Sequence, residues 1–197
     1  MYREELKNEI LMSYQELVDY LLNKYGPAEY DYFCNESCRS RDQKVSRGGE
    51  GLQCHHIDED KAIQLSVTKF ALNNPYDYQK ADRLVYCNVF EHLLLHMKIA
   101  FEPRNSDANM WENPGVGGII NILKGINDYY DGYGYKKKHQ KKMYDIIANN
   151  FDEYIGLLVV LQVNVKTYRP DCALTLSKEN ICRGHKGNIV KRVYDRL

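Results

Sequence analysis

Two stretches decide how the rest of the chain is interpreted: Cys54-His55-His56-Ile57-Asp58-Glu59-Asp60 and Leu84-Val85-Tyr86-Cys87-Asn88-Val89-Phe90-Glu91-His92-Leu93-Leu94-Leu95-His96. Four of the six histidines of the chain lie in these two segments. The pattern predicts a short strand over 51–57, a second strand over 83–87, and a helix over 89–101. The first strand and the helix therefore each carry two of these histidines.

The spacing of these histidines favours a metal site. His92 and His96 are four residues apart, and a helix places such residues on one face with Cβ atoms about 5–6 Å apart. Two imidazoles in that arrangement can bind one divalent ion. Adjacent residues of a strand point to opposite sides, so we expect His55 and His56 to do different jobs. One would face the metal and the other a water molecule or a substrate phosphate.

Two motifs extend this pattern: Gly-Leu-x-Cys-His-His-Ile-x-Glu-Asp-Lys-Ala over 51–62 and Leu-Val-Tyr-Cys-Asn-x-x-Glu-His-Leu-Leu-Leu-His over 84–96. They resemble the HNH, or ββα-metal, nucleases, and in particular HNH proteins of bacterial mobile elements and phages. The resemblance covers residues 51–101, about a quarter of the chain. It implies an α+β fold, mostly helical, with a small ββα-metal motif between an N-terminal helix and a C-terminal helical region.

The resemblance also implies a role for each histidine. His55 and His92 match metal ligands, and His56 matches the general base that activates a water molecule. His96 matches the second helical histidine of the family, which is either a third ligand or a phosphate contact. An imidazole suits the role of base because its ordinary pKa near ~6.5 leaves it largely neutral at cellular pH.

One position departs from the family pattern. The family usually carries an asparagine nine residues before the first helical histidine, and this chain has Arg83 there. Asp82 and Asn88 lie nearby as substitutes, and Arg83 itself would contact the scissile or an adjacent phosphate. Asn88 also suits the N-cap of the helix that follows, with Glu91 completing a capping box, so both interpretations of Asn88 stay open.

The resemblance implies a metal-dependent DNA endonuclease with one divalent ion as cofactor: Mg²⁺, Mn²⁺, Ni²⁺ or Zn²⁺. Imidazole ligands favour the transition metals over Mg²⁺. Two alternatives stay open. The first is a catalytically impaired module of a phage or mobile element that binds nucleic acid or protein, and the second is a toxin-like nuclease that cleaves RNA.

Contacts with nucleic acid would have to come from local basic clusters, because the 27 basic and 27 acidic residues leave no net charge. One cluster precedes the histidine pair and the other follows a loop rich in tyrosine, a residue type that stacks on bases. The expected contacts are Arg41, Lys44, Arg47, Lys136, Lys137, Lys138 and Lys141.

The rest of the chain indicates helices. Apolar spacing predicts one helix over 2–25 that ends at Gly26-Pro27; it serves as a scaffold, and a homodimer interface is the alternative. Further helices are predicted over 118–130 and 143–150, whereas 151–165 is equally compatible with a helix or a strand. We divide the chain into a nuclease core over 1–103 and a helical region over 104–197 that packs on the core and contacts nucleic acid.

The remaining composition argues for a cytoplasmic protein without a membrane segment. No secretory signal is recognisable, and the longest apolar run, 155–161, is far shorter than the ~20 residues that span a bilayer. We therefore expect the six cysteines to be reduced thiols. Cys34 and Cys38 have three residues between them and no matching second pair, which argues against a zinc knuckle.

Overall fold

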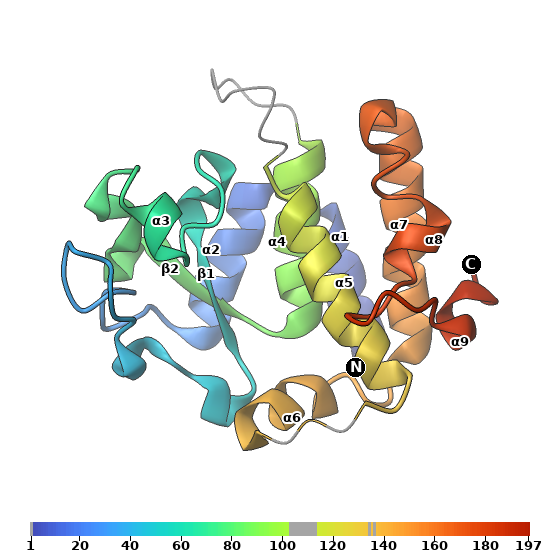
Figure 1. The fold of residues 1–197 in the computed structure, drawn as a ribbon, viewed down its shortest axis with the longest axis horizontal. Helices are drawn as coiled ribbons and strands as arrows, with labels where there is room; N and C mark the ends of the chain where they lie inside the picture. Colours follow the sequence, from blue (N-terminus) through green and yellow to red (C-terminus); the bar gives the residue numbers. More distant parts are fainter. Residues whose placement is uncertain (1, 103–113, 134, 136) are drawn as a thin grey trace.

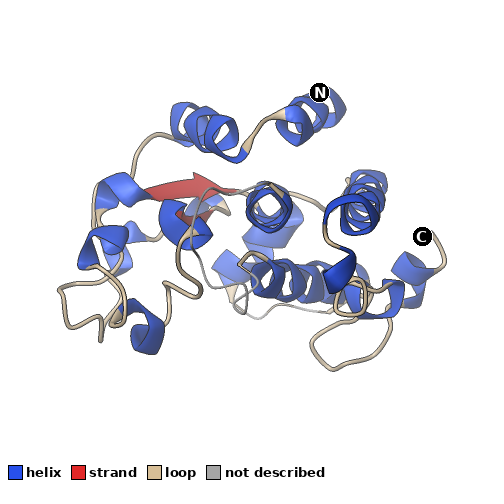
Figure 2. Cartoon of the chain, turned by 90° about the horizontal axis from the view of Figure 1, so that it is seen from above, coloured by secondary structure: helices blue, strands red, loops and turns tan. Residues whose placement is uncertain are grey.

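The computed structural model describes residues 2–102, 114–133, 135 and 137–197. Within this part of the chain the fold is mostly helical with one small antiparallel sheet, which confirms the α+β prediction (Figures 1 and 2). The elements in chain order are α1 (Tyr2–Leu11), α2 (Tyr14–Tyr25), β1 (Gln53–His56), α3 (Thr68–Ala71), β2 (Leu84–Cys87), α4 (Val89–Phe101), α5 (Val116–Tyr130), α6 (Lys138–Asp145), α7 (Phe151–Tyr168), α8 (Lys178–Ile181) and α9 (Lys191–Tyr194).

Short 3₁₀ turns connect several of these elements. The turns that matter for the site are η1 (Gln43–Val45), η2 (Gly48–Glu50), η3 (Ile57–Asp60) and η4 (Tyr76–Gln79). Two more, η5 (Ala81–Arg83) and η6 (Pro170–Cys172), lead into β2 and follow α7.

The prediction of one N-terminal helix over 2–25 is wrong, because the helix is broken between α1 and α2. Ser13 caps α2: its side chain accepts a hydrogen bond from the backbone of Glu16, and the Glu16 carboxylate accepts one from the backbone of Ser13. This reciprocal capping box satisfies two backbone donors that a helix start leaves open. The Ser-x-x-Glu spacing is visible in the sequence and could have indicated the break.

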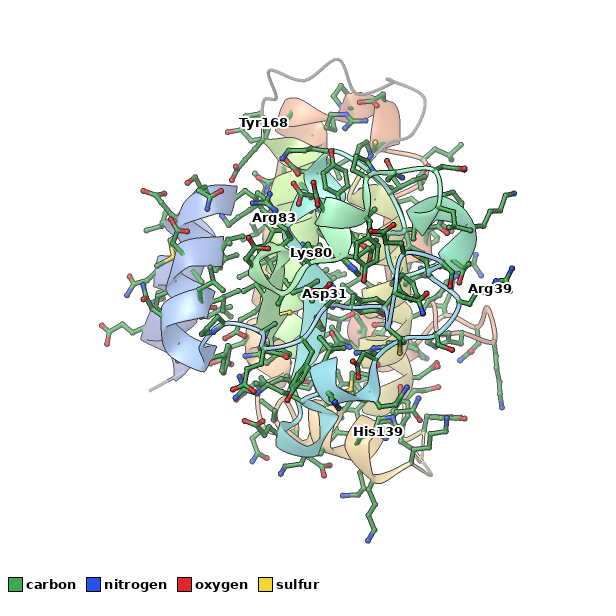
Figure 3. The ribbon with its side chains drawn as sticks, turned by 90° about the vertical axis from the view of Figure 1, so that its left-hand side faces the viewer. Asp31, Arg39, Lys80, Arg83, His139 and Tyr168 are labelled. Atoms are coloured by element: carbon green, nitrogen blue, oxygen red, sulfur yellow. The ribbon has the colours of Figure 1, made fainter. Side chains whose placement is uncertain are left out.

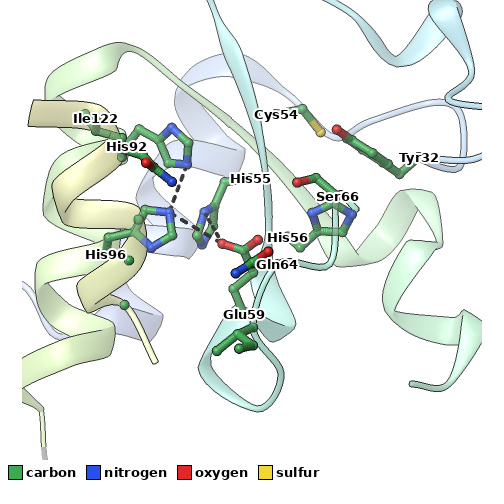
Figure 4. A pocket seen from close by; sticks show the side chains of 15 residues that line it. Tyr32, Cys54, His55, His56, Glu59, Gln64, Ser66, His92, His96 and Ile122 are labelled. Atoms are coloured by element: carbon green, nitrogen blue, oxygen red, sulfur yellow. Dashed lines mark hydrogen bonds and ion pairs between the residues drawn. The ribbon is translucent and has the colours of Figure 1, made fainter. Parts of the chain in front are cut away.

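The sheet places the two histidines of β1 on opposite sides. β1 and β2 pair antiparallel, with His55 opposite Val85 and His56 opposite Leu84. Both strands are four residues long, so β1 is shorter than the predicted 51–57. Figure 4 shows His55 on the side of β1 that faces α4 and His56 on the other side. The alternation expected for a strand is therefore observed.

Helix α4 is the centre of the molecule, and helices from both halves of the chain pack around it (Figure 1). Twelve of its thirteen residues are buried, which explains why its sequence is apolar nearly all round. The main core joins Leu17 of α2, Phe90 and Leu93 of α4, Ile126 of α5 and Tyr154 of α7. Residues on both sides of position 103 thus share one hydrophobic core.

The helical predictions for the second half are confirmed with shifted boundaries. The helix predicted over 118–130 begins at Val116, and the one predicted over 143–150 begins and ends earlier as α6. The undecided segment 151–165 is helical and extends to Tyr168. The short helix α3 spans Thr68–Ala71 and has no side-chain cap. None of the described helices is both long and apolar enough to cross a lipid bilayer.

Candidate metal centre

Three histidines from two elements converge beside the sheet. His55 comes from β1, and His92 and His96 come from successive turns of α4 (Figure 4). One ring nitrogen from each lies within 4.8 Å of the other two. The Nε2 atoms of His92 and His96 are 3.2 Å apart. The structure therefore brings together the three residues that the sequence predicts as metal ligands.

The hydrogen bonds of His55 fix which nitrogen carries its proton. The Tyr14 hydroxyl donates its single proton to the carbonyl oxygen of Ile57, at 2.7 Å. The same hydroxyl lies 3.1 Å from Nε2 of His55, so this nitrogen must be the donor. The lone pair of His55 is then on Nδ1, a buried atom without a hydrogen-bond partner. Tyr14 thus leaves Nδ1 free for a metal ion, as an outer partner of a ligating imidazole does.

His92 is oriented in the same way by a different partner. Its Nδ1 lies 2.6 Å from Oε1 of Gln53, an amide oxygen that only accepts hydrogen bonds. Nδ1 therefore carries the proton, and the lone pair on Nε2 faces His96. The Nδ1 atom of His96 is buried without a partner. A methyl group at Gly118 would fall on the ring of His96, so the start of α5 closely covers this imidazole.

Burial keeps all three rings neutral. Removal from water lowers the pKa of His96 to about 4, and it lowers the pKa values of His55 and His92 well below their usual range. The neighbouring imidazoles reinforce the effect on His55 and His92. Neutral imidazoles offer lone pairs, and two of these rings contain orphaned buried nitrogens. The donor set fits a divalent transition-metal ion.

Glu59 is a site residue that was not among the predicted metal ligands. Its Oε2 lies 3.4 Å from Nε2 of His96 and 3.7 Å from Nδ1 of His55. Burial raises the pKa of this carboxyl to about 7, against a hydrogen bond from the backbone of Leu65 that lowers it. Only its place in η3, three residues past the end of β1, could have indicated that Glu59 turns inward.

Arg83 lies away from the cluster, bound to the buried carboxylate of Asp58. Its Nε and one terminal nitrogen lie 2.7 and 2.6 Å from the two carboxylate oxygens, and Lys61 adds a contact of 2.6 Å. These cations hold the pKa of Asp58 below its usual range despite its burial. The phosphate contact expected of Arg83 stays a prediction; in the structure this side chain binds Asp58, the residue that precedes Glu59 in η3.

Asn88 is the N-cap of α4, and its side chain binds the backbone of the first helical turn. Its Oδ1 accepts hydrogen bonds from the backbone of Phe90 and Glu91, and the Glu91 carboxylate accepts one from the backbone of Asn88. The capping interpretation of Asn88 is therefore observed, and its catalytic role stays a prediction. Capping also fixes where α4 begins, and so where His92 and His96 lie.

His56 lines the same pocket from the other side of β1. The pocket has a volume of about 310 Å³ and is also lined by Tyr32, Glu59 and the three clustered histidines. Nε2 of His56 lies 2.9 Å from Oε1 of Gln79, whose amide nitrogen donates to the carbonyl of Leu65. His56 is thus the donor to Gln79, and its Nδ1 keeps a lone pair. Burial lowers the pKa of His56 to about 4.

The basic residues before the site have different surroundings. The guanidinium of Arg41 lies 4.8 Å from the ring of Tyr32, which in turn packs 4.4 Å from His56. Arg47 is bound to Glu50 at 2.5 Å and to the carbonyl of Tyr25, and Lys44 lies over Tyr30. Arg41 is therefore the member of this group that reaches the pocket lining.

The second basic group lies on α6, at the end of the molecule labelled His139 in Figure 3. Helix α6 packs against η2, where a methyl group at Gly48 would approach Cβ of His139 to 3.2 Å. Lys141 pairs with Asp145 at 2.8 Å. Lys137 lines a separate pocket near His185, Lys138 begins α6, and Lys136 lies outside the described residues.

The cysteines form no comparable cluster in the described ranges. All six are free thiols. Among the described residues, the group of three or more His, Cys, Asp or Glu side chains close enough to bind one ion is the histidine trio. A comparison of the chain with protein-family models, with curated proteins and with solved structures found no match.

Proposed function

We propose that this chain is a metal-dependent endonuclease of the HNH, or ββα-metal, type that hydrolyses phosphodiester bonds in DNA. The observation that carries the proposal is the convergence of His55, His92 and His96 within an antiparallel strand pair and the helix that directly follows it. His56 lines the same pocket from the opposite face of β1. The element order and the opposite orientations of the two adjacent histidines both support this proposal.

The three clustered imidazoles would hold the ion through Nδ1 of His55 and Nε2 of His92 and His96. The tautomers of His55 and His92 are preset by Tyr14 and Gln53, so the lone pairs of these two rings need no rearrangement. A divalent ion bound there supplies Lewis-acid stabilisation of the charge that develops on a phosphate during hydrolysis. The protein contributes the fixed geometry and the partly enclosed pocket.

His56 is the general base of the proposed reaction. Gln79 fixes its tautomer by accepting the Nε2 proton. Its lowered pKa keeps the ring neutral at physiological pH, so Nδ1 can accept a proton from a water molecule in the pocket. Packing against Tyr32 limits the ring to one orientation.

Arg41 is the best-placed side chain to bind the substrate phosphate. Among the ion pairs of the described residues, none involves Arg41, whereas Arg47, Arg83 and Lys141 each contact a carboxylate. Its guanidinium stacks on Tyr32 at the pocket that contains His56. An arginine in this state can offer its hydrogen-bond donors to phosphate oxygens without first losing an acidic partner.

The test is cleavage of supercoiled plasmid with Mg²⁺, Mn²⁺, Ni²⁺ or Zn²⁺. His56→Ala should reduce nicking by about 100-fold or more, within the range typical of a lost general base. His185→Ala is the matched control, since His185 is exposed and pairs with Asp128 away from the pocket. Undiminished nicking by the His56 variant would eliminate the role given to this residue.

A second candidate is a catalytically impaired module that binds nucleic acid or protein. The observation that favours it is the engagement of Arg83 and Asn88 in structural contacts, since both were expected to complete the catalytic set. The same plasmid experiment separates the two functions: a binding module retards DNA in a gel without nicking it. Parallel assays with single-stranded RNA test the third function, an RNA-cleaving toxin-like nuclease.

A further inference from the structure

Glu59 points its carboxylate at the same space as the three imidazoles. Figure 4 shows the side chain rising from η3 toward His55 and His96, with contacts to both. Oε2 lies 3.4 Å from Nε2 of His96 and 3.7 Å from Nδ1 of His55. Nε2 of His96 is the nitrogen that faces His92, and Nδ1 of His55 is the nitrogen without a hydrogen-bond partner.

These separations match the edges of a coordination tetrahedron. With bonds of about 2.0–2.1 Å from zinc to nitrogen or oxygen, ligand atoms lie about 3.3–3.4 Å from one another. The His92–His96 separation of 3.2 Å and the Glu59–His96 separation of 3.4 Å both fall near this value. The Glu59–His55 separation of 3.7 Å needs a shift of only a few tenths of an ångström.

We propose that Glu59 is the fourth protein ligand, so that the site is a three-histidine, one-carboxylate centre for a first-row transition-metal ion. This inference deepens the proposed function and rests on it, because it assumes that the three histidines bind a divalent ion. With four protein ligands the ion would bind a substrate phosphate by expanding to five-coordinate. A carboxylate oxygen adds a hard, negatively charged donor to three imidazoles, and this combination suits Zn²⁺, Mn²⁺ or Co²⁺.

The turn that carries Glu59 is held in place on both sides. Asp58, its neighbour, is buried and bound by Arg83 and Lys61. The backbone of Leu65 donates a hydrogen bond to the Glu59 carboxylate itself. A side chain anchored at its backbone and at its carboxylate is prearranged as a ligand, in contrast to an acid on an open charged turn.

The experiment compares wild type with Glu59→Gln, which keeps the shape of the side chain and removes its charge. Zn²⁺ affinity is measured by competition with a chromophoric chelator, and Co²⁺ binding by the visible absorption of the ion. Glu36→Gln is the matched control, because Glu36 is exposed on the loop that follows α2. Circular dichroism of the metal-free variants checks that each one folds.

We expect Glu59→Gln to weaken Zn²⁺ binding by more than about 100-fold, beyond the 10- to 100-fold loss typical of a residue that only orients a ligand. The Co²⁺ spectrum of this variant should change in intensity and band position, while that of Glu36→Gln should not. An unchanged Co²⁺ spectrum in Glu59→Gln overturns the inference, whatever the change in affinity.

Failure of this inference is distinguishable from failure of the proposed function. If His92→Ala abolishes Zn²⁺ binding and Glu59→Gln leaves the Co²⁺ spectrum unchanged, the histidine site stands and Glu59 is excluded as a ligand. If wild-type protein takes up neither Zn²⁺ nor Co²⁺, the proposed metal-dependent function fails together with the inference. Plasmid cleavage is not needed for either decision.

Discussion

Glu91 and His92 are consecutive residues of α4, yet they belong to two different polar clusters. His92 belongs to the histidine trio, and Glu91 belongs to a group of carboxylates around Lys24. Glu91 accepts hydrogen bonds from Lys24 at 2.6 Å, from the Tyr25 hydroxyl at 3.0 Å and from the backbone of Asn88 at 2.6 Å. Lys24 also reaches Glu5 at 2.6 Å and Glu9 at 3.4 Å. We refer to Lys24, Glu5, Glu9 and Glu91 as the lysine cluster.

The two clusters differ in how fully their buried polar atoms are paired. In the described part of the chain, the buried atoms without a hydrogen-bond partner include one nitrogen of His55 and one of His96, and none from the lysine cluster. A closed network holds α1, α2 and α4 together, because each charge has a partner. Buried nitrogens that are oriented but unpaired favour a site that binds something else. The contrast separates a scaffold from a candidate centre on one helix.

Removing the cation of the lysine cluster should have the largest effect on stability. Lys24→Met keeps the length of the side chain but removes the ammonium group that pairs with the buried carboxylates of Glu9 and Glu91. We expect the free energy of unfolding in urea to fall by about 3–4 kcal/mol. If the clusters are independent, the Zn²⁺ affinity of the folded variant stays at the wild-type value. A parallel loss of affinity would show that the lysine cluster also positions the histidines.

A smaller effect on stability, combined with one on the site, is expected at the contact between α5 and α4. Gly118→Ala would drive a methyl group into the ring of His96, so it should cost about 2–3 kcal/mol of stability and weaken Zn²⁺ binding. Gly117→Ala is the matched control, since a methyl group there meets no atom within 4 Å. That variant should gain about 0.5–1 kcal/mol, because alanine favours the helix. Equal melting temperatures for the two variants would contradict the close contact.

The histidine trio could be predicted from the sequence because its geometry is mostly local. The i, i+4 spacing of His92 and His96 requires only that α4 is helical, and the alternation of His55 and His56 requires only that β1 is a strand. The antiparallel pairing of the strands then brings the two pairs together. The capping role of Asn88 was also among the interpretations, since a capping box is a four-residue pattern.

The rest of the site could not be predicted, because it depends on contacts between distant segments. Gln79 reaches His56 from η4, and Tyr14 reaches His55 from α2. Gly118 lies against the ring of His96 because of the way α5 packs on α4. No local sequence pattern predicts that packing. Glu59 turns inward because Asp58 is pinned by Arg83, and without that pair the acidic run is typical of a solvated turn.

The lysine cluster also predicts a dependence of stability on pH. Burial and the neighbouring carboxylates raise the pKa of Glu9 to about 7, above its ordinary value of 4.5. Between these values the folded state holds a proton that the unfolded state has lost, so stability falls as pH rises through this window. Glu9→Gln removes the penalty and should be about 1–2 kcal/mol more stable than wild type at pH 8, with little difference at pH 4.

Glu5→Gln is the control with the opposite sign for this experiment. Glu5 lies on the same helix and contacts the same lysine, but hydrogen bonds from Lys24 and Tyr20 lower its pKa. Its charged form therefore stabilises the folded state above pH 4.5, and Glu5→Gln should lose stability at pH 8. Urea titrations of both variants from pH 4 to pH 8 measure the two trends. Parallel trends in the two variants would contradict the assignment of charges within the cluster.

The smallest effect that still distinguishes the two clusters concerns Tyr14, whose hydroxyl links His55 to the carbonyl of Ile57. Tyr14→Phe keeps the ring and removes the group that fixes the His55 tautomer. We expect Zn²⁺ affinity to fall by about tenfold, the lower end for an outer partner of a ligand.

Tyr25→Phe is the corresponding change in the lysine cluster, where the lost hydroxyl contacts Glu91. It should reduce the free energy of unfolding by about 1 kcal/mol and leave Zn²⁺ affinity unchanged. Zn²⁺ competition measures the affinity of Tyr14→Phe and of Tyr25→Phe, and urea unfolding measures the stability of each. The division into scaffold and centre predicts that the affinity loss appears only in the Tyr14 variant. If Tyr25→Phe weakens Zn²⁺ binding as much as Tyr14→Phe does, the two faces of α4 act as one unit.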